Sequence, residues 1–362
     1  MDCHLIAALA ERLAPHVPLG KARRETLGML TAGMISARTT NLSHLACERG
    51  TAGVKVASTY RRLQRFFQHV ELPDDWVAPL VSGLAGGGGP GTLPRRLILD
   101  RTNWKVGKRE VNILVLAIAT RHHRLALMWT VLDRAGNSGA PERIALMQRY
   151  IAMFGKDSIG MLLADREFIG ADWLNWLTQN DIPFTIRMRA SHHALTPDGN
   201  RWRLGTLLTR PRGTRRATAC LPGVAQALHF AAKTPSGREA VIVATNRPSA
   251  RALEIYRKRW AVEGCFGDAK TRGLNFEDTR LTCARKLHLL TAIVALAAAW
   301  ATAMARSPDG PTAPNRKTHG YLAKSWFRTG FDHLRCLLRA SPNRTLTPWD
   351  TLSVQIIPKG VV

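Results

Sequence analysis

The segments that decide the fold are residues 97–101, LILDR, and residues 161–166, MLLADR. Each is a short apolar run that leads into an aspartate followed by an arginine, as in a buried β-strand that ends at a polar residue. A carboxylate at the end of a buried strand is costly to desolvate unless it is paired or bound to a metal ion. Open α/β sheets place their functional sites at the carboxyl ends of their strands. We therefore predict that Asp100 and Asp165 lie together at one edge of a sheet. The alternative is that each aspartate only opens a turn or caps the next segment.

The sequence around these segments alternates between strand-like and helix-like patterns. Apolar runs of strand length occur at 97–99, 111–120, 125–132, 159–164 and 183–189. Helical patterns occur at 141–154, with a proline in the first turn, and at 171–179. Strands that alternate with helices predict an α/β fold built on a mixed sheet.

Residues 1–81 are predicted to be helical and basic, with ten Lys and Arg against four Asp and Glu up to residue 70. A helix at 42–48, capped by Thr40-Asn41, and a basic helix at 59–70, capped by Ser58, have the outline of a helix-turn-helix. The candidate DNA contacts of the second helix are Arg61, Arg62 and Arg65. The alternative is the solvated basic face of an ordinary helical bundle. A Gly/Pro linker is expected at 82–94.

The whole chain has 362 residues and a formal net charge of +26, from 52 Lys and Arg against 26 Asp and Glu. This charge favours a polyanionic partner, with nucleic acid the first candidate and an acidic membrane surface the second. The six cysteines include no C-x-x-C pair, so neither a zinc site nor a disulfide framework is expected. Residues 1–16 lack the apolar core of a signal peptide, so we expect a cytoplasmic protein.

Residues 289–305 carry no charge and come close in length to a membrane span. The run is rich in alanine, contains two threonines, and is shorter than the roughly 20 residues that a span needs. We therefore expect a buried core helix here and no membrane partner.

A third feature is a row of polar residues at helical spacing, Tyr256, Arg259, Glu263 and Lys270. At about 100° per residue they fall at about 0, 300, 340 and 320° around a helix, within a stripe about 60° wide. This set resembles a metal ligand beside phosphate clamps, because Arg binds phosphate through two parallel hydrogen bonds and Lys binds it as a point charge. The alternative is a solvent-exposed face with an ion pair between Arg259 and Glu263.

Three carboxylates, Asp100, Asp165 and Glu263, are therefore the candidate catalytic residues and metal ligands. Such a set can hold two Mg²⁺ ions about 3.5–4 Å apart for in-line displacement at phosphorus, and Mn²⁺ is a possible substitute. The pairs His122-His123 and His192-His193 lack the spacing of zinc ligands, so no metal role is expected for them.

The combined pattern resembles a known family. Residues 256–270 are similar to the Y-R-E-K signature of bacterial insertion-sequence transposases of the DDE class, in the group named after insertion sequence four. Residues 99–104, LDRTNW, resemble the first aspartate block of that family, and residues 163–168, LADREF, resemble the second. The resemblance covers nearly the whole chain.

The resemblance implies an RNase H-like core, interrupted by a β insertion and preceded by a helical DNA-binding domain. Residues 186–250 fit such an insertion, with short β-like runs and eleven Lys and Arg against two acidic residues. The implied domains are 1–81 (helical, DNA-binding), 82–94 (linker), 95–189 and 251–306 (the two parts of the core), 190–250 (β insertion) and 307–362 (a tail with a helix at about 324–339).

The implied activity is cut-and-paste transposition of the element that encodes the chain. Asp100, Asp165 and Glu263 would ligate two Mg²⁺ ions. The implied contacts to DNA phosphates are Tyr256, Arg259, Lys270 and Arg166. The partners would be the terminal inverted repeats and target DNA, bound by a dimer in the synaptic complex, and the protein would be associated with the bacterial nucleoid.

Members of this family often cleave through a hairpin at the transposon end, with one base flipped onto aromatic residues. Trp202 is the first candidate for that platform, and Trp104, close to Asp100, is the second. A tryptophan between two arginines can equally pack with cations on an exposed strand. Gly264 and Gly267 follow Glu263, so Lys270 is expected on a bent or interrupted helix.

Two other functions stay open from the sequence. A catalytically decayed or repurposed DNA-binding protein would keep the same charge and helix-turn-helix outline. A membrane-associated protein would rest on residues 289–305 alone.

Overall fold

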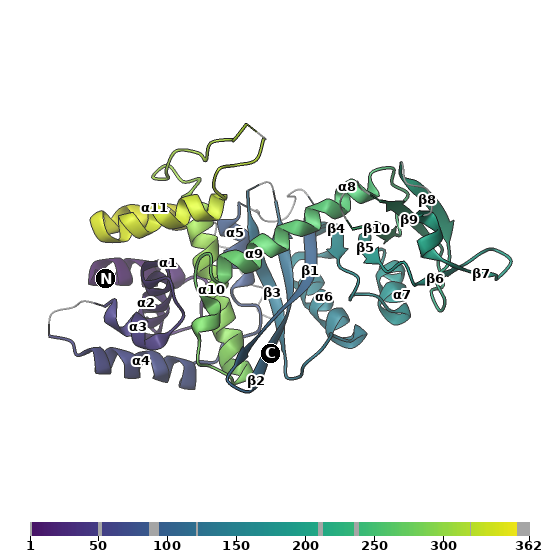
Figure 1. The fold of residues 1–362 in the computed structure, drawn as a ribbon. Helices are drawn as coiled ribbons and strands as arrows, with labels where there is room; N and C mark the ends of the chain where they lie inside the picture. Colours follow the sequence, from purple (N-terminus) through teal and green to yellow (C-terminus); the bar gives the residue numbers. More distant parts are fainter. Residues whose placement is uncertain are drawn as a thin grey trace.

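The structure is a computed structural model that describes residues 2–49, 53–86, 94–120, 122–208, 213–234, 239–318 and 320–352. Its centre is an eight-stranded sheet with the strand order β3-β2-β1-β4-β5-β10-β9-β8 (Figure 1). The strands of this sheet are β1 (Arg95–Val106), β2 (Arg109–Ala119), β3 (Arg124–Leu132), β4 (Ile159–Ala164), β5 (Phe184–Met188), β8 (Arg215–Ala219), β9 (Leu228–Lys233) and β10 (Val241–Thr245).

The sheet is mixed, as the sequence predicts. Strands β1, β4 and β5 run parallel to one another, and the remaining neighbours pair antiparallel. A meander of three strands followed by two parallel strands is consistent with an RNase H-like core. Strands β8 to β10 of the predicted insertion join β5 and extend this sheet (Figure 1). A separate two-stranded sheet contains β6 (His193–Leu195) and β7 (Arg201–Arg203).

The burial of the strands follows their sequences. Strand β2 is apolar from Ile113 to Ala119 and buried along that length, as expected for a strand covered on both faces. Strand β1 is buried from Leu97 to Leu99 and then alternates between buried and accessible residues. Asp100 stands at the point where the pattern changes.

Two helices connect the strands of the core. Helix α6 (Ala140–Phe154) has a proline in its first turn and is capped by a hydrogen bond from the Gly139 N–H to the Glu142 carboxylate, at 2.7 Å. Helix α7 (Ala171–Gln179) follows β4. Both helices were predicted from the sequence at nearly these bounds.

Past β10 the chain forms helix α8 (Ala252–Arg257), a 3₁₀ turn (Lys258–Trp260) and helix α9 (Ala261–Ala269). Together α8 and α9 cross the front of the sheet (Figure 1). Helix α10 (Ala284–Met304) packs beside α9, and its apolar side chains are buried throughout its length. It is long and apolar enough to span a membrane, but most of it is buried inside the fold. The prediction of a core helix is therefore confirmed.

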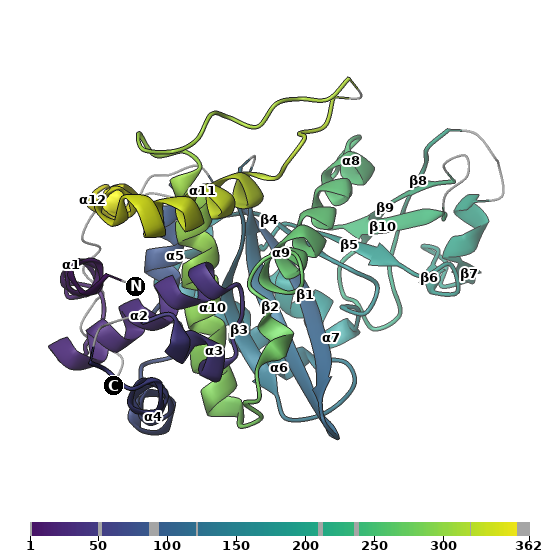
Figure 2. The same cartoon turned by 60° about the vertical axis from the view of Figure 1, so that its left-hand side comes forward.

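The amino-terminal part consists of helices that lie beside α10 in both ribbon views and share one apolar core with it (Figure 2). They are α1 (Cys3–Leu13), α2 (Lys21–Ala37), α3 (Leu42–Cys47), α4 (Val56–His69) and α5 (Ala78–Leu84). Helix α3 begins as predicted, with the Asn41 side chain accepting a hydrogen bond from the Ser43 N–H. Helix α4 begins three residues before the predicted start, and Ser58 lies inside it.

Helix α4 is fixed to the sheet domain by side chains of α10. The Arg285 guanidinium donates hydrogen bonds to the carbonyl oxygens of Phe67, Gln68 and Val70, at 3.0–3.1 Å. These are carbonyls at the carboxyl end of α4, which have no partner within the helix. The last described helices, α11 (Trp326–Ala340) and α12 (Thr347–Asp350), pack on α10 as well. Of the predicted linker, residues 82–84 form the end of α5, and residues 87–93 lie outside the described part of the chain.

Candidate active site

The sheet brings Asp100 and Asp165 to neighbouring positions. In the parallel pair β1–β4 the last partners in register are Leu99 and Ala164, and the two aspartates follow them directly. Each aspartate is held in the same way, because its Oδ1 accepts a hydrogen bond of 2.8 Å from the N–H of the next residue. The two aspartates are therefore neighbours, as predicted, but only β4 ends there: β1 continues through Asp100 to Val106, paired with β2.

Asp100 lies in an environment that disfavours its charge. Burial raises the pKa of Asp100 to about 6, and the nearby carboxylates of Glu167 and Asp165 act in the same direction. The Arg101 N–H and the Arg259 guanidinium act against this rise. Since burial and neighbouring carboxylates both disfavour the charged form of Asp100, a further cation beside it would stabilise that form.

Two residues of α8 and the 3₁₀ turn contact this pair, and Glu263 of α9 is linked to it through Arg259. The Tyr256 hydroxyl donates a hydrogen bond to the Asp165 Oδ1 at 3.1 Å. The Arg259 guanidinium, 9% exposed, makes an ion pair of 2.9 Å with the Asp100 Oδ2 and one of 3.4 Å with the Glu263 Oε1. Burial raises the pKa of the Tyr256 phenol, so the phenol stays a hydrogen-bond donor at neutral pH.

The carboxylate oxygens of this site suit a hard divalent cation, although the three carboxylates do not surround one point. Asp100 and Asp165 supply adjacent carboxylate oxygens, the ligand type that Mg²⁺ and Mn²⁺ prefer. Glu263 is 43% exposed and lies on the other side of the Arg259 guanidinium from Asp100. Across the described ranges, no three acidic, His or Cys side chains converge closely enough to hold one ion together. Two aspartates therefore fit a metal site, and Glu263 does not complete it in this structure.

The helix that carries Lys270 is interrupted, as expected, although the break comes before Glu263 and not at Gly264 or Gly267. The 3₁₀ turn interrupts the helix, and α9 ends at Ala269, so the ideal stripe of four residues does not form. The Lys270 ammonium lies 5.4 Å from the Trp104 ring, makes an ion pair of 2.6 Å with Glu277, and donates to the Asn103 carbonyl oxygen at 3.4 Å. Lys270 therefore flanks β1 beyond Asp100 and does not touch the carboxylates.

A comparison with known families bears on this arrangement of one aspartate within β1, one directly after β4 and a glutamate on α9. Residues 91–300 match the family described as the transposase DDE domain. The chain belongs to this family. The match spans the strands that carry the two aspartates and the helices that carry Tyr256, Arg259 and Glu263. No curated protein matches the chain.

The remaining predicted site residues of the DDE transposase lie outside the carboxylate cluster. Arg166 is half-exposed and makes an ion pair of 3.2 Å with Glu239, which also binds Arg187 at 2.8 Å. Trp104 is 8% exposed and packs on Phe276 with a ring-centroid distance of 4.8 Å. Its buried ring cannot serve as an open stacking surface in this conformation.

Trp202 belongs to a different part of the transposase. It lies in β7, opposite Ala194 of β6, and is partly buried against the apolar core. In both ribbon views β6 and β7 stand at the end of the molecule beyond β8 to β10, away from α9 (Figures 1 and 2). The structure does not bring Trp202 to the carboxylates.

The three candidate arginines of α4 differ in their surroundings. Arg61 and Arg65 are exposed. Arg62 packs against α2, donating to the Thr26 hydroxyl and the Ala22 carbonyl oxygen at 2.8 Å and pairing with Glu25 at 3.3 Å. Arg62 thus fixes α4 to α2, and the other two face solvent.

Several residues that hold the site were missed by sequence reasoning. Arg101 makes an ion pair of 3.3 Å with Glu167, which joins the segments that follow the two aspartates. The buried Arg143 of α6 donates to the carbonyl oxygens of Glu167 and Ile169 and so supports the segment after Asp165. The signal that could have found Arg143 is a cation on the apolar face of a predicted amphipathic helix.

Proposed function

We propose that this DDE transposase moves an insertion sequence of the insertion-sequence-four type by a cut-and-paste reaction. The observation that carries the proposal is the contact of Tyr256 with Asp165 and of Arg259 with both Asp100 and Glu263. Tyr256, Arg259 and Glu263 are the residues of the Y-R-E-K pattern that resemblance assigns to this reaction. The substrate is phosphodiester DNA, cleaved by hydrolysis and then joined by strand transfer.

We assign Asp100, Asp165 and Glu263 as the residues that hold two Mg²⁺ ions, with Mn²⁺ as a substitute. When bound, such ions activate the attacking oxygen and stabilise the leaving oxygen of an in-line displacement. Without DNA, the Arg259 guanidinium pairs with Asp100 and Glu263. When DNA binds, the same guanidinium can form two parallel hydrogen bonds with a DNA phosphate instead. Tyr256 orients Asp165 through its hydroxyl.

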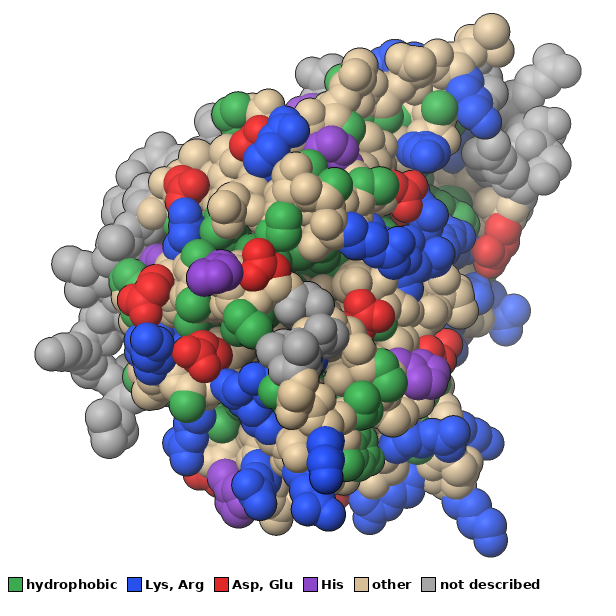
Figure 3. Space-filling model, turned by 90° about the vertical axis from the view of Figure 1, so that its left-hand side faces the viewer, with side chains coloured by type: hydrophobic (Ala, Val, Ile, Leu, Met, Phe, Trp, Pro, Cys, Tyr) green, Lys and Arg blue, Asp and Glu red, His purple; other side chains and the backbone are tan. Residues whose placement is uncertain are grey.

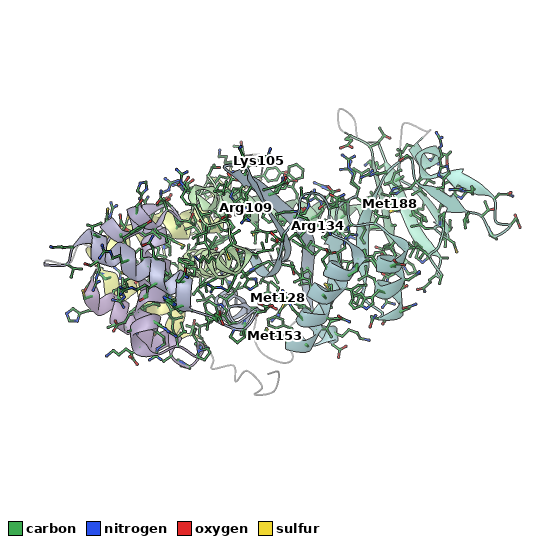
Figure 4. The ribbon with its side chains drawn as sticks, turned by 90° about the horizontal axis from the view of Figure 1, so that it is seen from below. Lys105, Arg109, Met128, Arg134, Met153 and Met188 are labelled. Carbon is green, nitrogen blue, oxygen red and sulfur yellow. The ribbon has the colours of Figure 1, made fainter. Side chains whose placement is uncertain are left out.

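DNA contacts near the cleaved end would come from Tyr256, Arg259, Lys270 and Arg166. The β1–β2 hairpin beyond Trp104 adds further cations. Seen from below, Lys105 and Arg109 lie close together at its end (Figure 4). Because β1 continues from Asp100 to this end, the hairpin can guide a duplex toward the carboxylates.

We propose that the amino-terminal helices bind the terminal inverted repeats through α3 and α4, two consecutive helices that pack against each other. The exposed Arg61 and Arg65 line a groove of about 500 Å³ between α4 and the segment 279–286. That segment adds Arg280 and Lys286 to the same groove. Lys and Arg side chains gather along the lower edge of this end of the molecule (Figure 3).

A hairpin at the transposon end is the proposed intermediate of cleavage. A flipped base needs an accessible aromatic ring, and flipping costs a few kcal/mol of unstacking. Trp202 in the β insertion stays the proposed residue on which the flipped base stacks. This requires DNA that reaches β6 and β7. Two ends must be synapsed, so we propose a dimer in the complex with DNA.

Cleavage of a labelled duplex that carries the element's own terminal repeat tests this function. In Mg²⁺ at about 0.15 M salt, which screens loose contacts, the protein should cut at the repeat boundary, and EDTA should abolish the cut. A hairpin product would migrate as a single species of double length on a denaturing gel. Binding of the repeat without any cut, in Mg²⁺ and in Mn²⁺, would instead support the catalytically decayed DNA-binding protein.

A further inference from the structure

A cleft on the outer side of α9 is lined by arginines from four separate parts of the chain. They are Arg38 after α2, Arg124 at the start of β3, Arg272 after α9 and Arg328 of α11, and we call this site the arginine cleft. Its volume is about 380 Å³. None of the roles assigned above uses these residues.

The arginine cleft has an excess of positive charge. Asp268 is the one acidic residue among the described residues that line it. Arg328 makes an ion pair of 2.9 Å with Asp332 outside the lining. Within the described part of the chain, the guanidinium groups of Arg38, Arg124 and Arg272 form no ion pair, and the Nε of Arg38 is buried without a hydrogen-bond partner. Four guanidinium groups that share a single carboxylate leave an excess of positive charge, which indicates a site for an anion.

The neighbouring helix surface reinforces this charge. Burial, followed by repulsion from Arg38, Arg339 and Arg328, lowers the pKa of Arg335 on α11. The positive field around the cleft is therefore strong enough to affect an adjacent guanidinium.

The arginine cleft shares α9 with the candidate active site but lies on another face. Gly264 and Asp268, which line the cleft, are about 100° and 140° around the helix from Glu263. A Cβ at Gly264 would lie 2.7 Å from the Arg124 Nη1, so the glycine gives Arg124 room to lie against α9. Binding at this cleft would place a ligand on the side of α9 that faces away from the carboxylates.

The lining fits a phosphate group better than a nucleobase. Beside the arginines and Asp268 it contains Gly264 and Ser325, and it contains no aromatic or large apolar side chain on which a base could stack. Planar guanidinium groups match the oxygens of a phosphodiester in bidentate geometry. A contact of this kind is independent of base sequence.

We propose that the arginine cleft binds a backbone phosphate of DNA, so that α9 is held between this contact and the DNA at the carboxylates. The proposal rests on the proposed function for the presence of DNA. It adds a phosphate site on α9 that lies outside the Y-R-E-K set.

The test uses the full chain and a fluorescent duplex of random sequence, titrated at several NaCl concentrations. The variant is the double substitution Arg124→Ala/Arg272→Ala, since both residues are exposed. Loss of one phosphate contact lowers the slope of log affinity against log salt by about 0.9, which is about fivefold in affinity at 0.15 M salt. We expect a loss of at least this size.

Two further variants separate charge from structure. Arg247→Ala/Arg251→Ala removes two exposed arginines that already pair with acidic residues, and we expect the wild-type slope. Arg124→Lys/Arg272→Lys keeps the charges, and we expect most of the slope to return. An unchanged slope in the alanine variant, with its thermal unfolding intact, would overturn the proposal.

Small phosphate compounds are the alternative ligands of the arginine cleft, because they carry the same group as the DNA backbone. Inorganic phosphate and a mononucleotide are each tested for a rise in Tm of the wild type that the alanine variant lacks. Such a rise together with unchanged duplex binding would overturn the assignment to DNA. Because this assay reads binding and not cleavage, an inactive transposase that still shows the slope change would leave the arginine cleft supported while the proposed function failed.

Discussion

The Arg259 guanidinium lies between two carboxylates of the site, 2.9 Å from the Asp100 Oδ2 and 3.4 Å from the Glu263 Oε1. Both Arg259 and Asp100 are largely buried, so this pair is a structural element of the protein without DNA. It also places one cation between the two acidic side chains.

Replacing Arg259 with alanine should destabilise the fold by about 3 kcal/mol, because it leaves the buried Asp100 without its cation. The effect should be smaller at pH 5 than at pH 8, since burial raises the pKa of Asp100 to about 6 and the protonated carboxyl needs no cation. Urea unfolding at both pH values measures this. In an Asp100→Asn background the same substitution should cost much less, and an equal cost in both backgrounds would contradict the pairing.

The Tyr256→Phe substitution should remove one hydrogen bond to Asp165 and lower the free energy of unfolding by about 1–2 kcal/mol. It should also slow single-turnover DNA cleavage, because Asp165 loses its orienting partner. Tyr150→Phe is a matched control, because it also removes one hydroxyl hydrogen bond, that of 2.9 Å with Ser158, and should leave the cleavage rate unchanged. Equal cleavage rates of the two variants would show that the Tyr256 hydroxyl has no role in the reaction.

Asp268 makes the stability of the protein depend on pH. Burial raises its pKa to about 7, although Arg124, Arg272 and Arg328 act against the rise, while the unfolded chain titrates near 3.8. Between these values the folded protein holds a proton that the unfolded chain has released. The stability from this group is therefore present at low pH and is lost as the pH rises toward 7, by about 1.4 kcal/mol per pH unit.

The Asp268→Asn substitution should flatten that dependence and raise the unfolding free energy above pH 7. Denaturant unfolding across pH 5–8 compares the variant with the wild type. A steeper loss in the variant, or lower stability at pH 8, would mean that the ionised Asp268 is favourable among its arginines.

The Arg285→Ala substitution should loosen α4 from α10, because three hydrogen bonds to the end of α4 are lost. We expect faster hydrogen exchange of the α4 amides and a destabilisation of about 1–3 kcal/mol. Lys286→Ala is the control, since Lys286 reaches α4 through the Gln68 side chain alone. Equal exchange in both variants would contradict the role of Arg285.

Much of the sheet was predictable from local pattern. The apolar run 159–164 forms a strand at those bounds, and the meeting of Asp100 with Asp165 follows from parallel neighbouring strands. The fold class and the family could also be predicted from the sequence. The two aspartate blocks and the spacing from Tyr256 to Glu263 are together typical of DDE transposases.

What could not be predicted depends on contacts between distant segments. The pairing of β10 with β5, which attaches β8 to β10 to the sheet, could not be predicted because the two strands are far apart in sequence. The position of Lys270 depends on a 3₁₀ turn and a helix end that ideal spacing does not reveal. The arginine cleft collects residues from four elements, and no sequence motif marks such a set.

The central claim is that Asp100, Asp165 and Glu263 perform the chemistry. Single-turnover cleavage of the element's end in Mg²⁺ should be compared among wild type, Asp100→Asn, Asp165→Asn and Glu263→Gln, with Asp172→Asn, an acidic residue in the first turn of α7, as the control. We predict that each of the first three variants loses cleavage while retaining binding of the end, and that the control cleaves like the wild type. Cleavage at the wild-type rate by any of the three would contradict the account.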